Sequence, residues 1–117
     1  MKLKFNILKQ NKKLGIDNTK ATIPQIMNKL GEEYCELQVA FINYTKNKTL
    51  SNLKEIIRET YDLIQVCILV LFRANITANT LEEYNLIADI NKEHIEKLKG
   101  RGWETEADIN VEVERKE

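Results

Sequence analysis

The sequence predicts an all-α protein, built as an antiparallel helical hairpin followed by a third helix. Hydrophobic residues recur at three- and four-residue steps in two long segments, which is the period of an amphipathic helix. One proline and four glycines are too few for the many tight turns of a β-sandwich or barrel. With 117 residues, 43% of them hydrophobic and 31% charged, the chain suits one globular domain.

The first helix is expected to run from about Thr22 to Tyr44. Pro24 suits its first turn, because the backbone N–H that proline lacks has no partner there. The polar segment Thr45–Leu50 then forms a connection. The hydrophobic stripe of this helix comprises Ile23, Ile26, Met27, Leu30, Leu37, Ala40, Phe41 and Tyr44.

The second helix is expected to begin at a Ser51 cap and to run to about Arg73. Beyond Asp62 it is hydrophobic on nearly every side, so burial on several sides is expected there. Two other helices of the same chain cannot cover all of this surface, which predicts a homodimer or homotetramer. Cys35 and Cys67 are expected to be small buried residues.

The third helix is expected to follow a break at residues 75–79. Thr80 and Glu83 have the spacing of a capping box, in which each residue's side chain bonds the other's backbone. The helix is expected to end at Gly100 and Gly102, because glycine readily adopts the left-handed conformation that closes a helix.

A single domain over residues 1–117 is expected, with its core at about 22–103. Residues 1–21 are an N-terminal arm or a short helix, and residues 104–117 are a frayed tail. Eighteen Lys and Arg residues balance 18 Asp and Glu residues, so the charge does not point to nucleic acid. The longest hydrophobic run, Leu63–Phe72, is far shorter than the about 20 residues of a membrane helix. We therefore expect a cytoplasmic protein that binds neither membrane nor nucleic acid.

Five acidic residues follow the pattern EExxE, then 22 residues, then ExxD. A helix advances about 100° per residue, so Glu33 lies about 20° from Ile26, within the hydrophobic stripe. Glu59 and Asp62 have the same relation to hydrophobic residues of the second helix. A surface helix normally turns its acids away from this face. The five residues are Glu32, Glu33, Glu36, Glu59 and Asp62.

An antiparallel hairpin would bring four of these acids to one level. The pairs Glu36–Glu59 and Glu33–Asp62 share one midpoint, which lies within the polar connection. Crowded like charges are costly unless a cation offsets them. Carboxylate oxygens suit Mg²⁺ or Mn²⁺, so all four residues are predicted metal ligands. The alternative is that these acids lie on the solvated rim of two charge-rich helices.

At these residues the sequence resembles the MazG-like superfamily of all-α nucleoside triphosphate pyrophosphohydrolases. The superfamily's EExxE and ExxD motifs are both matched, and the resemblance covers about residues 22–103, including HIEKLKGRGW at His94–Trp103. It implies Mg²⁺ bound through the acids, hydrolysis of nucleoside triphosphates to monophosphate and pyrophosphate, and dimers or tetramers. The N-terminal region is shorter than in the family, so the base that the pocket accepts stays open.

The resemblance suggests roles for three further residues. Glu32 lies about 100° from the stripe and is expected to position or deprotonate the attacking water. Lys97 and Arg101 lie one turn apart and are expected to contact the phosphates. The alternative is that both are solvated charges at a helix C-terminus. His94 is expected to be a partly exposed helix residue.

Two other functions stay open at this stage. One is a non-catalytic helical module whose hairpin binds a partner protein. The other is a relative of the enzymes that senses nucleotides without efficient turnover. Pyrophosphate release from a panel of nucleoside triphosphates separates hydrolysis from both.

Overall fold

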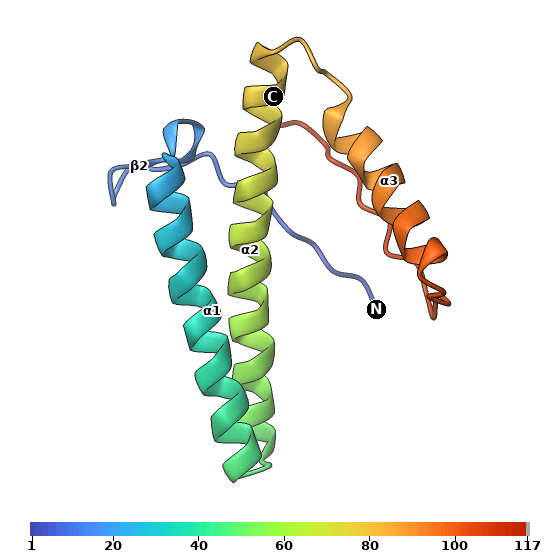
Figure 1. Cartoon of the computed structure of the whole chain (residues 1–117). Coiled ribbons are helices and arrows are strands. Elements are labelled where there is room, and N and C mark those ends of the chain that lie inside the picture. The colour runs from blue at the N-terminus through green and yellow to red at the C-terminus, as the bar shows by residue number, and fades with distance from the viewer. Residues whose placement is uncertain (117) are drawn as a thin grey trace. The chain divides into compact units, whose positions relative to one another are not determined.

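The computed structural model describes residues 1–116 and is all-α, with one very short sheet (Figure 1). The chain forms two units, Met1–Tyr84 and Asn85–Glu117. The predicted all-α class is confirmed; the predicted single domain stays a prediction. The elements are β1 (Gln10–Asn11), β2 (Ile16–Asp17), the 3₁₀ helix η1 (Asn18–Lys20), α1 (Ile23–Lys46), α2 (Leu50–Thr80) and α3 (Leu86–Gly100).

α1 closely matches the predicted first helix. The Thr22 hydroxyl accepts a hydrogen bond from the Gln25 backbone N–H at 3.3 Å, and the Thr22 N–H donates to Gln25 Oε1 at 2.9 Å. This reciprocal pair is a capping box, which satisfies donors that a helix start otherwise leaves unpaired. Pro24 lies in the first turn, as predicted.

α2 differs from the prediction at both ends. Its cap is Thr49, whose hydroxyl accepts from the Asn52 N–H at 3.2 Å, so Ser51 lies inside the first turn. The break predicted at residues 75–79 is wrong, because α2 continues to Thr80. That segment contains neither Gly nor Pro, and an Asn or Thr costs a helix less than about 1 kcal/mol, too little to end it.

α3 begins later than predicted. Thr80 is the last residue of α2, and its hydroxyl donates to the Thr77 carbonyl oxygen at 2.6 Å. The capping box predicted for Thr80 and Glu83 is therefore wrong. The residue before α3 is Asn85, which makes no side-chain capping bond.

The C-terminal end of α3 is closed by glycine, as predicted. Gly102 has a φ of 86°, which suits a residue without Cβ. The Trp103 N–H donates to the Leu98 carbonyl at 3.1 Å and the Gly102 N–H to the Lys99 carbonyl at 3.0 Å, which is the Schellman pattern. Residues 104–116 are exposed and form no helix or strand; the predicted tail also includes Glu117, which lies outside the described residues.

The N-terminal segment contains a small hairpin rather than a helix. β1 and β2 are antiparallel, with Gln10 opposite Asp17 and Asn11 opposite Ile16. Gly15 lies in the connecting turn with a φ of 66°, a conformation that glycine adopts without strain. We call residues 1–21 the arm.

Two polar side chains of α2 fasten the arm. Gln65 Nε2 donates to the Asn6 carbonyl oxygen at 2.7 Å. The Arg73 guanidinium donates to the carbonyl oxygens of Ala21, at 3.2 Å, and Thr19. The arm is thus bound to the second half of α2 at two points.

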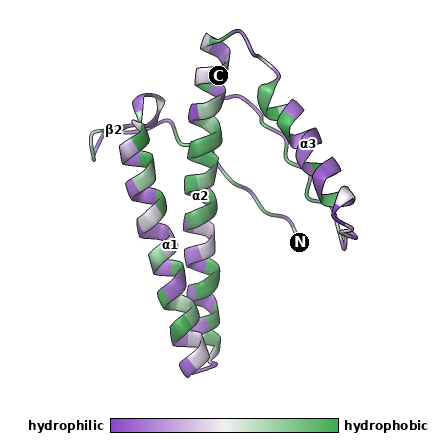
Figure 2. Cartoon of the chain, viewed as in Figure 1, coloured by the Kyte–Doolittle hydropathy of each residue, from purple (hydrophilic) through white to green (hydrophobic). Residues whose placement is uncertain are grey.

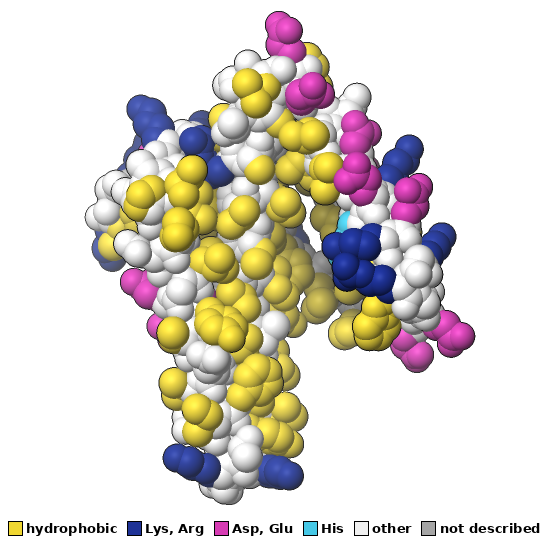
Figure 3. Space-filling model, viewed as in Figure 1, with side chains coloured by type: hydrophobic (Ala, Val, Ile, Leu, Met, Phe, Trp, Pro, Cys, Tyr) yellow, Lys and Arg dark blue, Asp and Glu magenta, His cyan; other side chains and the backbone are white. Residues whose placement is uncertain are grey.

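The hydrophobic core between α1 and α2 is a narrow stripe. Hydrophobic residues are exposed along both helices, for example Met27 at 65% and Leu71 at 53%. Figure 2 shows hydrophobic residues concentrated in the second half of α2, and Figure 3 shows hydrophobic side chains across the visible face of the helix pair. Cys35 and Cys67 are exposed, so their predicted burial is wrong; two helices cover only one side of each other. Within residues 1–116, the buried residues are Glu33, Ala40, Val66 and Ala78.

α2 is also, among the described residues, a helix long and hydrophobic enough to cross a membrane. Its most hydrophobic 18-residue stretch has a mean hydropathy of 1.4 and is 11% buried. The core helix of a soluble protein meets the same criteria, so length and composition alone do not make α2 a membrane span. The bonds from Arg73 to the polar arm occur in this half of the helix.

Candidate metal centre

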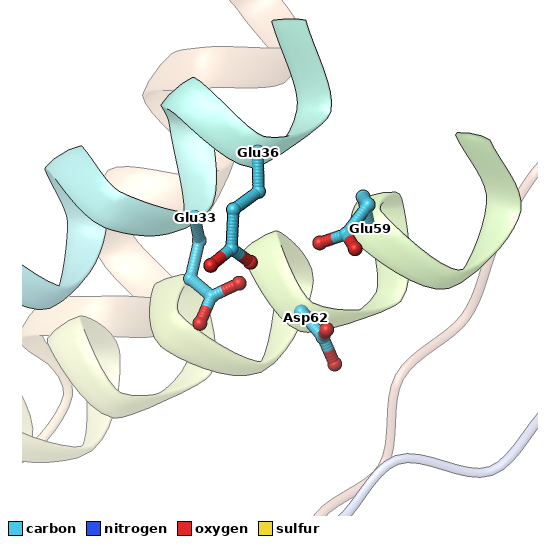
Figure 4. Close-up of side chains that lie close together, drawn as sticks. All are labelled: Glu33, Glu36, Glu59 and Asp62. Carbon is cyan, nitrogen blue, oxygen red and sulfur yellow. The ribbon is translucent and has the colours of Figure 1, made fainter. Parts of the chain in front are cut away.

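Four carboxylates meet between α1 and α2 (Figure 4). Glu33 and Glu36 extend from α1, and Glu59 and Asp62 from α2. One oxygen atom of each lies within 4.8 Å of one from every other. The convergence predicted from the hairpin register is therefore observed, whereas the binding of a metal stays a prediction. We call these four residues the acidic cluster.

The spacing of the acids explains why they meet. Residues three apart on a helix are neighbours on its surface, so each helix contributes an adjacent pair. Buried Ala40 follows Glu36 by one turn, and buried Val66 follows Asp62 by one turn. Both pairs therefore continue the stripe along which α1 and α2 pack.

Burial differs among the members of the acidic cluster. Glu33 is only 6% exposed. Among the described residues, its Oε2 atom and the Oε2 atom of Glu59 are buried and have no hydrogen-bond partner. A buried carboxylate oxygen without a partner is costly, and coordination to a cation would satisfy it. Glu36 and Asp62 are exposed, so the acidic cluster is open to solvent on one side.

The protein's own cations offset little of this charge. Lys29 Nζ lies 3.0 Å from Glu33 Oε1 and 3.8 Å from Glu32 Oε2. The hydrogen bond to Glu33 raises the pKa of Lys29, which keeps it charged. Arg58 pairs instead with Glu55, outside the acidic cluster. Within residues 1–116, one lysine thus pairs with one of the four carboxylates.

The neighbouring carboxylates favour the protonated form of Glu36 when no metal is bound. Hydrogen bonds to Glu59 and Glu33, followed by the charge of Glu33, raise the pKa of Glu36. Two carboxylates at one level of a hairpin repel each other, which favours the protonated form of Glu36. A divalent cation would displace this proton.

The other predicted site residues lie outside the acidic cluster. The Glu32 side chain is 65% exposed and lies beside Lys29, on the same helix as Glu33. Lys97 and Arg101 belong to the second unit, where the Arg101 N–H donates to the Lys97 carbonyl at 3.1 Å, so they are one turn apart. The roles expected for these three residues stay predictions. His94 is exposed in α3.

A groove beside the acidic cluster was not anticipated from the sequence. It has a volume of about 780 Å³ and is lined by the arm, by α1 and by α2, including Glu33 and Asp62. The sequence did contain a signal for the turn of the arm that lines this groove, because glycine, aspartate and asparagine in Gly15–Asn18 are typical of a turn. Strands of two residues are too short to show an alternating pattern.

Comparison with known proteins finds no family model, no curated protein and no solved structure that matches the chain. The resemblance to the MazG-like superfamily rests on the acidic motifs and the His94–Trp103 stretch and stays a prediction. A function must therefore be argued from the geometry of the acidic cluster.

Proposed function

We propose that the protein is a nucleotide pyrophosphohydrolase that requires Mg²⁺ or Mn²⁺ and converts nucleoside triphosphates to monophosphate and pyrophosphate. The observation that carries the proposal is the buried Glu33 Oε2 atom, which has no hydrogen-bond partner among the described residues and lies among three other carboxylates. A purely structural acid in this position would be expected to have its oxygens paired.

The donor set fits a hard divalent cation. Glu33, Glu36, Glu59 and Asp62 offer only carboxylate oxygens, which Mg²⁺ and Mn²⁺ prefer, whereas Zn²⁺ sites usually include His or Cys. The acidic cluster is open on the side of Glu36 and Asp62. Mg²⁺ is typically held by a few carboxylates together with substrate phosphates, so an open side suits the proposed substrate.

A bound divalent cation would bind phosphate oxygens and stabilise the charge that develops as the anhydride breaks. The protein's residues have the remaining tasks. Lys29 holds Glu33 in place through their 3.0 Å contact. We assign to Glu32, which is exposed and lies beside Lys29, the positioning of the water that attacks phosphorus. The water oxygen bonds to one phosphorus of the α–β anhydride, the bond from that phosphorus to the bridging oxygen breaks, and Glu32 accepts the proton.

The proposal extends to phosphate contacts, assembly and location. Lys97 and Arg101, one turn apart, would contact the phosphates. The exposed hydrophobic faces of α1 and α2 support a homodimer or homotetramer. A cytoplasmic location fits a nucleotide substrate and the polar contacts of Arg73 on the hydrophobic half of α2.

A non-catalytic interaction module is the second candidate, and the same exposed hydrophobic faces favour it. It differs from the enzyme in its use of the acidic cluster, because docking a partner helix needs no buried, unpaired carboxylate. A nucleotide sensor would use the acidic cluster for binding but release no pyrophosphate at a useful rate.

Pyrophosphate release tests the proposal directly. The purified protein is incubated with each common ribo- and deoxyribonucleoside triphosphate in Mg²⁺, in Mn²⁺ and in a chelator. We expect release from at least one nucleotide with a metal ion and none with the chelator. Absence of release from every nucleotide with both ions would exclude the enzyme and leave the sensor or the interaction module.

A further inference from the structure

The groove described above joins the acidic cluster to the arm. Glu33 and Asp62 contribute to its lining together with Asn11 and Asn18 of the arm. Its volume of about 780 Å³ is within the range of about 300–1,000 Å³ that small-molecule pockets occupy. A ligand with phosphates at the acidic cluster would therefore have its other end in this groove.

We infer that the groove binds the nucleoside part of the substrate and that the arm is the element that recognises the base and sugar. The inference rests on the proposed function, because it takes the ligand in the acidic cluster to be a nucleotide. It adds a recognition site made by residues outside the acidic motifs.

The charge of the groove disfavours a second phosphate. Among the described residues that line it, Lys29 is the one cation and is already paired with Glu33, while Asp17 adds a carboxylate outside the acidic cluster. A second phosphate site would need more cations. A nucleoside carries no charge, so it can occupy the groove while its phosphates remain at the acidic cluster.

The groove also offers both kinds of contact that a base requires. Ile26, Leu69 and Phe72 provide hydrophobic surface, and Phe72 provides a ring on which a base can stack. Carboxamides such as Asn18 and Gln65 carry a donor and an acceptor on one planar group, as the edge of a base does.

The amide groups are already oriented by bonds to backbone. Asn18 Nδ2 donates to the Leu8 carbonyl oxygen at 3.0 Å, and Gln65 Nε2 donates to the Asn6 carbonyl oxygen at 2.7 Å. Each bond uses the nitrogen end and leaves the side-chain oxygen to accept from a base or a hydroxyl. Preorganised groups of this kind lower the entropic cost of binding.

The experiment fills the groove without altering the acidic cluster. Ala21 is half-buried and lines the groove, whereas Ala74 is exposed on α2 and does not. Ala21→Trp is the test variant and Ala74→Trp the matched control. Binding of the ribo- and deoxyribonucleoside monophosphates in Mg²⁺ is measured by calorimetry. The shift of the melting temperature in Mn²⁺ reports the acidic cluster separately.

We expect at least one monophosphate to bind the wild-type protein. Ala21→Trp should weaken that binding by about tenfold or more, while Ala74→Trp changes it by less than about twofold. The rise of the melting temperature in Mn²⁺ should be the same in the wild type, Ala21→Trp and Ala74→Trp. Equal binding to both variants, or an equal loss in both, would overturn the inference.

Hydrogen exchange of the wild-type protein keeps the inference testable if Ala21→Trp does not fold. The bound monophosphate should slow amide exchange in residues 7–18 and leave exchange in the connection at residues 47–49 unchanged. Unchanged exchange in residues 7–18 would refute the role of the arm. A Mn²⁺ shift without monophosphate binding would overturn this inference alone, whereas absence of both would also remove the proposed function.

Discussion

At the residue scale, the members of the acidic cluster are not equivalent. Glu33 is buried and paired with Lys29, whereas Glu36 is exposed and makes no ion pair within residues 1–116. Removing the charge of Glu36 therefore leaves no cation without its partner. Glu36→Gln therefore distinguishes the two roles. A ligand role predicts that the metal-free variant is no less stable than the wild type, whereas a charge-paired structural role predicts that it is less stable.

Glu36→Gln should lower pyrophosphate release by about tenfold or more, because one ligand charge is lost where charge develops in the reaction. The metal-free variant should be no less stable than the wild type, since one like-charge repulsion disappears. Glu83→Gln, an exposed acid outside the acidic cluster, is the matched control. Wild-type turnover, or a markedly lower metal-free melting temperature, would refute the assignment of Glu36 as a ligand.

The raised pKa of Glu36 predicts how stability changes with pH. The folded protein holds this proton more tightly than the unfolded chain, in which glutamate has a pKa of about 4.3. The associated stability is present below that pH and is lost as the pH rises through the raised value. Glu33, Glu59, Asp62 and Lys29 surround the group in both the wild type and Glu36→Gln, so a comparison of the two reports the removal of the Glu36 carboxyl group.

The metal-free melting temperature of Glu36→Gln, relative to the wild type, should therefore increase over the pH range that begins at about pH 4. Melting curves across this range in a chelator provide the measurement. A difference that stays constant or narrows as the pH rises would show that Glu36 holds no extra proton.

At the element scale, the hydrophobic periodicity of the sequence predicted the long helices. It missed the features that have no such repeat, which are the end of α2 and the hairpin of the arm. The stripe containing Ile26 and Ala40 gave α1 nearly to its ends, and shared register brought Glu36 opposite Glu59. The end of α2 was missed because the weak helix formers of residues 75–79 are outweighed by the continuing helix. The hairpin of the arm was missed because its two strands have only two residues each and show no alternating pattern.

Arg73→Ala should release the arm from α2. Its bonds to the Ala21 and Thr19 carbonyls involve a charged donor that is partly buried, so the loss should be about 1–3 kcal/mol of unfolding free energy. Arg58→Ala is the matched control, because Arg58 is exposed and should cost less than about 1 kcal/mol. Urea denaturation gives the free energies, and tryptic cleavage within the arm should accelerate only in Arg73→Ala. Equal cleavage in both variants would contradict the fastening of the arm.

At the scale of the whole molecule, a two-helix core does not cover its own hydrophobic surface. Phe41 is 51% exposed and Leu71 is 53% exposed. The sequence indicated this excess, since α2 is hydrophobic on nearly every side beyond Asp62. It could not indicate which surface covers it, because hydrophobic burial is not directional.

We predict a homodimer or homotetramer at micromolar concentration, measured by light scattering. Leu71→Asp should shift the assembly towards the monomer, because an unpaired charge is costly in a hydrophobic interface. A wild-type monomer at this concentration would contradict the prediction and would favour a different protein as the partner of this face.

The central claim is that the acidic cluster binds a divalent cation, and thermal melting with and without millimolar Mn²⁺ or Mg²⁺ tests it most directly. A cation that binds only the folded protein stabilises it by about 2.7 kcal/mol at one hundred times its dissociation constant. We predict a clear rise of the melting temperature in the wild type and a smaller rise in Glu36→Gln. An unchanged melting temperature in both ions, with nucleotide present as well as absent, would contradict the claim.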